Sequence, residues 1–137
     1  LRRTFATNLV DGARVTASAT RQPEAQFGAA AVLDGNPDTF WMAPPGQTAA
    51  ALTLEWLSPR TFDVISLQEA ITRGQRIERV CVSAAGDDGV WHSVAETTTV
   101  GHRRLLRVAP VTARRVRIEI LESRESPTLA TIGLYKS

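Results

Sequence analysis

The sequence of 137 residues is 43% hydrophobic and 22% charged, which is the length and composition of one globular domain. It has no apolar run of about 18 residues that could span a membrane, and no apolar N-terminal region typical of a signal peptide. The net charge of +2 includes fifteen arginines and one lysine. Because Arg115, Arg117 and Glu119 alternate with apolar residues, we interpret these charges as a solvated strand face and expect no nucleic-acid partner.

Alternation of apolar and polar residues predicts strands along most of the chain. The Gly86–Gly89 stretch, with its Asp-Gly pair, predicts a hairpin turn, and only 25–33 has the composition of a short helical turn. This pattern predicts a single all-β domain, a sandwich or jelly roll of about eight strands. The predicted strands cover 14–20, 51–56, 62–67, 77–83, 90–94, 105–108, 116–121 and 132–135.

Groups for catalysis are sparse in this sequence. The histidines are His92 and His102, and Ser93 beside His92 should point to the opposite face of its strand. The single cysteine, Cys81, lies in a strand-like run and is interpreted as an inert core thiol. No Cys/His metal spacing and no glycine-rich phosphate loop is present, so we expect no enzyme active site within this chain.

The stretch VLDGNPDTFW, residues 32–41, concentrates oxygen-bearing side chains in a tight turn. Hard cations such as calcium prefer carboxylate, hydroxyl and carbonyl oxygens, which Asp34, Asn36, Asp38 and Thr39 can supply. The same residues also suit an Asx-type turn that closes a short helix. The spacing alone leaves both interpretations open.

Several stretches along the chain resemble the discoidin family, also called coagulation factor 5/8 type C domains, which includes the family 32 carbohydrate-binding modules. The resemblance covers about residues 8–136 and implies a jelly-roll β-sandwich with ligand-binding loops at one end. The stretches that carry it are Asn8-Leu9, Val15 to Ser18, Leu33 to Trp41, and Ile132 to Tyr135.

A narrower resemblance is to the C-terminal discoidin-like domain of family 29 α-L-fucosidases. It implies that residues 1–137 are one domain of a larger, secreted or extracytoplasmic glycoside hydrolase whose catalytic barrel lies elsewhere. A start at Leu1 agrees with a domain taken from a longer protein. The matching stretches are 62–71, 74–77, 100–106 and 112–117.

The resemblance also implies one structural cation, calcium or sodium, beneath the ligand loops. Its ligands would be the Asp34 carboxylate, the Asn36 carbonyl, Thr39, and carbonyls of Ala31 and Ala130. The family usually has a glutamate after that last alanine, and here the position is Thr131. A site with Asp34 as its anionic ligand is expected to hold the cation weakly, and the turn would then join the two ends of the sandwich.

Sugar sites pair an aromatic face with hydrogen-bonding side chains, and the family's ligand loops are the expected place for fucose- or galactose-containing glycan. Trp41 suits a position in the hydrophobic core as well as one in a sugar site. The loops are polar, so we expect no insertion into a membrane. An alternative is a purely structural domain in which Gln68, Glu69, Gln75 and Arg76 dock on the catalytic barrel of the same chain. The sugar-binding candidates are Trp41, Gln68, Arg73, His102, Arg103 and Arg124.

Overall fold

The computed structural model describes residues 9, 13–20, 28–33, 39–70, 76–86, 89–98, 100 and 104–136. Within these ranges there are eight strands and one short 3-10 helix, so the predicted all-β class is confirmed. The elements are β1 (Arg14–Ala17), η1 (Ala29–Leu33), β2 (Trp41–Met42), β3 (Ala50–Gln68), β4 (Ile77–Ala85), β5 (Trp91–Thr97), β6 (Arg104–Ser123), β7 (Thr128–Leu129) and β8 (Thr131–Tyr135).

Two pairs of predicted strands are each one long, bent strand. β3 contains both 51–56 and 62–67, and β6 contains both 105–108 and 116–121. The β3–β6 register shifts between Glu55 and Arg60 and again between Phe62 and Val64. Pro59 and Pro110 fall in the unpaired stretches between these registers, where the missing proline N–H breaks no ladder hydrogen bond. The apolar alternation lapses at these bends, which is why sequence periodicity divides each strand in two.

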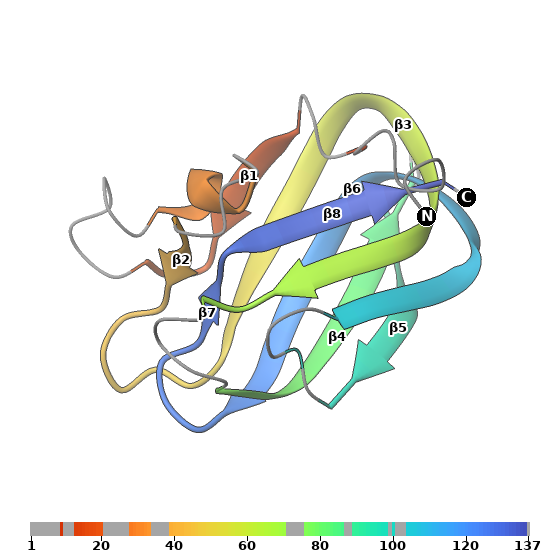
Figure 1. Cartoon of the computed structure of the whole chain (residues 1–137). Helices are drawn as coiled ribbons and strands as arrows, with labels where there is room; N and C mark the ends of the chain where they lie inside the picture. Colours follow the sequence, from red (N-terminus) through yellow and green to blue (C-terminus); the bar gives the residue numbers. More distant parts are fainter. Residues whose placement is uncertain are drawn as a thin grey trace.

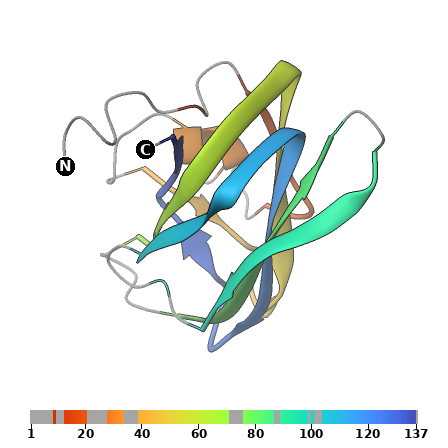
Figure 2. The same cartoon turned by 90° about the vertical axis from the view of Figure 1, so that its right-hand side faces the viewer.

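The bent β3–β6 pair builds both layers of the sandwich. The first part of β3 pairs with β1 and with the end of β6, and its last part pairs with the start of β6 and with β8. Beyond β6, the first layer continues through β4 to the edge strand β5. Figure 1 shows β8 and the end of β3 in front of β4, and the view in Figure 2 places the same strands on opposite sides of the molecule.

The core lies between these layers and follows strand phase. In one row across the first layer, Leu52 of β3 pairs with Ile118 of β6, which pairs with Val82 of β4. All three are buried because alternate strand residues point to the same face, and this face meets the second layer. The largest fully buried side chains are Trp41, Trp56, Phe62, Leu52, Leu54, Ile65, Leu67, Ile77, Ile118, Ile120, Leu129 and Ile132.

The predicted hairpin turn between β4 and β5 is confirmed. Gly89 has a φ of 73°, a conformation that favours glycine, and its N–H donates to the Gly86 carbonyl at 3.1 Å. The predicted helical turn at 25–33 corresponds to η1, which begins at Ala29, while residues 25–27 of that region lie outside the described ranges. In the part of the chain that the structure describes, no helix is long and apolar enough to cross a membrane.

Candidate functional site

Three connections meet at one end of the sandwich. Backbone N–H of Ala43 donates to the Pro127 carbonyl at 3.1 Å, and that of Arg124 donates to the Arg76 carbonyl at 2.9 Å. The Ser126 hydroxyl donates to the Pro44 carbonyl at 2.7 Å. We call this region, residues 43–49, 68–70, 76 and 124–127, the loop end. Its described connections are held together by direct hydrogen bonds from one to the next.

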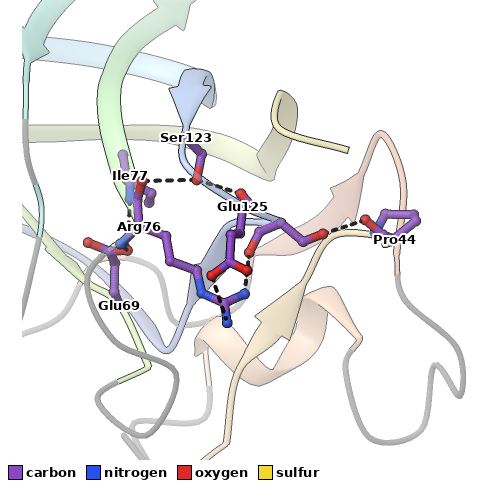
Figure 3. Close-up of polar contacts among 7 residues, drawn as sticks. Pro44, Glu69, Arg76, Ile77, Ser123 and Glu125 are labelled. Atoms are coloured by element: carbon purple, nitrogen blue, oxygen red, sulfur yellow. Dashed lines mark hydrogen bonds and ion pairs between the residues drawn. The ribbon is translucent and has the colours of Figure 1, made fainter. Parts of the chain in front are cut away.

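A buried carboxylate, Glu69, ties the end of β3 to the start of β4. The side chain is 2% exposed, and its Oε1 accepts hydrogen bonds from the backbone N–H groups of Arg76 at 2.8 Å and Ile77 at 3.0 Å (Figure 3). A buried carboxylate requires such donors because its desolvation is otherwise costly. Glu69 therefore fixes the two ends of the connection between these strands.

The Arg76 side chain extends this bracing to the connection after β6. Its Nη1 donates to the Ser126 carbonyl at 2.9 Å, and its Nη2 lies 3.6 Å from Glu125 Oε2. The Ser123 hydroxyl lies 3.0 Å from the Arg76 carbonyl and 2.7 Å from the Glu125 carbonyl, which share its one proton. As Figure 3 shows, Arg76 thus connects the start of β4 with the 123–126 turn through both its side chain and its backbone.

A second set of hydrogen bonds positions Gln68 at the end of β3. Its backbone carbonyl accepts from the Ala130 N–H at 2.7 Å, and its side-chain Oε1 accepts from the Thr131 hydroxyl at 3.2 Å. The next residue but one, Ala70, donates its N–H to the buried hydroxyl of Thr128 at 3.1 Å. Sequence reasoning missed Ser123, Ser126 and Thr128, since single hydroxyl residues in turns carry no periodic signal.

The predicted sugar-binding residues separate into three groups. Gln68 and Arg124 both lie at the loop end. The Gln68 side chain is partly exposed, and the exposed Arg124 has its Nε 3.8 Å from Glu78 Oε2. Trp41 is 0% exposed and its indole N–H donates to the Ala19 carbonyl at 3.0 Å, so it is a core residue and offers no ring face to a ligand. This corrects its place among the candidates. Arg73, His102 and Arg103 lie outside the described residues.

Two of the fucosidase-like residues proposed for docking, Glu69 and Arg76, make hydrogen bonds within the domain. Glu69 is buried on backbone N–H groups, and Arg76 is partly buried on the Ser126 carbonyl. These contacts brace the loop end, and docking on a catalytic barrel stays a prediction. Gln75 lies outside the described ranges.

The predicted cation site is only partly within the described residues. Asp34 and Asn36 lie outside them, while η1, which contains Ala31, packs against β2 and β8. Thr39 is partly exposed, the Ala130 residue is buried, and the Thr131 hydroxyl is used by Gln68. Among the described residues, no group of three or more His, Cys, Asp or Glu side chains could hold a metal ion. Since the one expected anionic ligand, Asp34, is not described, the cation stays a prediction.

Cys81 is not the core thiol that its surroundings in the sequence indicate. Val80 and Val82 on either side are buried, whereas Cys81 is partly exposed. Alternation within β4 places it on the outer face of the sheet, where its Sγ lies 3.7 Å from the Ser93 hydroxyl of β5. The Cys81 thiol therefore lies on the outer face of the sheet, beside the edge strand β5.

Comparison with known proteins agrees with this architecture. Residues 14–133 match the F5/8 type C domain. Alpha-L-fucosidase 1 of Arabidopsis thaliana is 33% identical over 134 residues, which are 96% of this chain and 26% of that protein. The chain thus spans about a quarter of the length of this relative.

Solved structures give the same result. This chain is similar to a family GH29 fucosidase of Ruminococcus gnavus in complex with fucose, with a TM-score of 0.91 and 33% sequence identity. The match covers 99% of this chain and 28% of the fucosidase. The family 32 carbohydrate-binding module of Clostridium perfringens NanJ, in complex with galactose, has a TM-score of 0.82 at 18% identity, over 93% of this chain and 96% of the module. The discoidin and fucosidase resemblances read from the sequence are confirmed, and the NanJ module shares the fold.

Proposed function

Because the chain belongs to the F5/8 type C domain family, we propose that it is the non-catalytic accessory module of an α-L-fucosidase and binds glycan at the loop end. The observation that carries this proposal is the similarity to the Ruminococcus gnavus fucosidase, which covers 99% of this chain but 28% of the fucosidase chain. The remainder of such a protein would contain the catalytic barrel that hydrolyses α-L-fucosides. The module would act outside the cytoplasm, where glycans of this kind are met.

The geometry of the loop end supports a glycan as the ligand. Glu69 and Arg76 hold the connections by hydrogen bonds to backbone groups, which limits the entropy that ligand binding would otherwise remove. Gln68 then presents a side-chain amide and Arg124 an exposed guanidinium. Amide and guanidinium N–H groups donate to the hydroxyl and ring oxygens of a sugar. Fucose- or galactose-containing oligosaccharides are the proposed ligands.

Calorimetric titration with fucose, galactose and fucosylated oligosaccharides tests this proposal. We expect saturable binding that Arg124→Ala weakens about three- to tenfold, in the range of one partly exposed charged hydrogen bond. Arg107→Ala is the matched control, because Arg107 is an exposed arginine on β6 opposite Val64. The absence of binding at millimolar sugar would remove glycan recognition from the proposal.

The structural alternative has one observation of its own. Leu57, at the bend of β3, is 97% exposed beside Ser58 and Pro59. Another domain, such as the catalytic barrel of the parent chain, would cover this side chain if it packed against the bend. If this alternative holds, Leu57→Ser lowers the melting temperature of the full-length fucosidase and leaves that of the module alone unchanged. Equal effects on both would speak against docking through this bend.

A further inference from the structure

The outer face of the first layer carries a hollow at a distance from the loop end. It has a volume of about 220 Å³ and lies on β1, β3, β5 and β6. We call it the outer-face hollow. The residues that line it are Arg14, Thr16, Thr53, Glu55, Trp91 and Arg115.

Strand register explains why these residues meet. Arg14 of β1 pairs with Glu55 of β3, which pairs with Arg115 of β6. Arg115 pairs with Ala85 of β4, which pairs with Trp91 of β5. Residues in one such row point to the same face of the sheet. Because the central residue Ala85 is small, the Trp91 side chain can reach across β4 to the arginine and glutamate side chains.

The polar groups of the hollow retain unused hydrogen-bond donors. Arg115 Nε donates to Glu55 Oε2 at 3.0 Å, which neutralises this pair. The Arg14 side chain is exposed and makes no hydrogen bond or ion pair with any residue that the structure describes. Arg117 stacks on the Trp91 ring, 4.3 Å from its centroid, and its buried Nε has no hydrogen-bond partner in the described ranges. Two arginines, Arg14 and Arg115, therefore line the hollow with one glutamate, and Arg117 lies against Trp91 beside it.

We propose that the outer-face hollow is a second binding site, for a sugar residue that carries a carboxylate. The stacked Arg117 holds the Trp91 ring, which can pack on the C–H groups of a pyranose. The Arg14 guanidinium offers the planar fork that matches a carboxylate, and the hydroxyls of Thr16 and Thr53 match sugar hydroxyls. The volume is below the roughly 300–1,000 Å³ of sites for drug-sized ligands, so it suits a single ring. This site is separate from the loop end and goes beyond the function proposed there.

An NMR titration of the indole N–H signals with glucuronate tests the site at low ionic strength, where the charges are least screened. Glucose and acetate are the matched ligands, since one lacks only the carboxylate and the other lacks the ring. We expect the Trp91 signal to shift and saturate with glucuronate, while those of Trp41 and Trp56, both buried, stay in place. Glucose and acetate should each bind at least about fivefold more weakly.

Variants separate this site from a general attraction between charges. Arg14→Gln should weaken glucuronate binding about three- to tenfold, whereas Arg107→Gln, an arginine outside the hollow, should leave it unchanged. Arg124→Ala should also have no effect, so a failure of the loop-end proposal is distinguishable from a failure of this one. A Trp91 signal that does not move, equal binding of acetate or glucose, or equal binding by Arg14→Gln would each overturn the proposal.

Discussion

The arginines of the loop end and of the outer-face hollow have opposite surroundings. Arg76 at the loop end is partly buried and directs its N–H groups to a backbone carbonyl and to Glu125. Arg14 at the hollow is exposed, and Arg117 packs its guanidinium on a tryptophan ring while its Nε has no partner among the described residues. The first arrangement stabilises the fold, whereas the exposed Arg14 guanidinium leaves its donors available to a ligand at the hollow.

This difference teaches that charged residue types alone do not identify a binding surface. The unusual Leu-Gln-Glu and Gly-Gln-Arg stretches of the sequence include the braces Glu69 and Arg76. The ordinary alternation around Arg115 and Arg117 includes the hollow. The two regions differ in the hydrogen-bond partners of their charged side chains.

The largest effect is expected from removing the brace at the loop end. Glu69→Ala should lower the free energy of unfolding by about 3 kcal/mol, because two backbone N–H groups lose their acceptor in a buried position. Urea denaturation of the wild type and the variant, with the same m-value for both, measures this loss of stability. Glu122→Ala, an exposed glutamate on β6, should cost less than about 0.5 kcal/mol. Similar losses for both variants would show that Glu69 is not a structural brace.

A smaller loss is expected from Thr128→Val, which keeps the side-chain shape but removes the acceptor of the Ala70 N–H. The expected cost is about 1–2 kcal/mol, since the site is fully buried. Thr112→Val is the control, because its hydroxyl meets that of Thr61 in an exposed position. If the two variants have the same stability, then the second set of hydrogen bonds at the loop end contributes little.

On the outer face, the stacking of Arg117 on Trp91 should be worth about 0.5–1 kcal/mol. A double-mutant cycle with Trp91→Ala and Arg117→Ala in thermal or urea unfolding measures this coupling. The value is well below the cost of losing Glu69, as the comparison between the two regions requires. A coupling of several kcal/mol would mean that the outer face is also a structural brace.

The smallest effect is expected from the Glu55–Arg115 pair, whose side chains are both close to half exposed. Glu55→Gln should cost about 0.5 kcal/mol at low salt and nothing measurable at high salt, because exposed ion pairs are screened. Unfolding curves at the two salt concentrations give the difference. A loss that persists at high salt would contradict a surface role for this pair.

Strand phase allowed much of the fold to be predicted from the sequence. The burial of Leu52, Ile118 and Val82 follows directly from alternation within each strand, although their pairing in one row does not. The bends in β3 and β6 could not be predicted, because alternation lapses there although the chain remains extended. The roles of Glu69 and Trp41 depend on partners far along the chain or within turns, and no local pattern encodes such partners.

The measurement that tests the central claim most directly is a residue-resolved NMR titration of this chain with a fucosylated oligosaccharide. We predict saturable shifts at the Gln68 side-chain amide and at the backbone of Arg124 and Ser126, with the strands of the core unchanged. Spectra that stay the same at millimolar oligosaccharide, or shifts confined to residues away from the loop end, would contradict glycan recognition there.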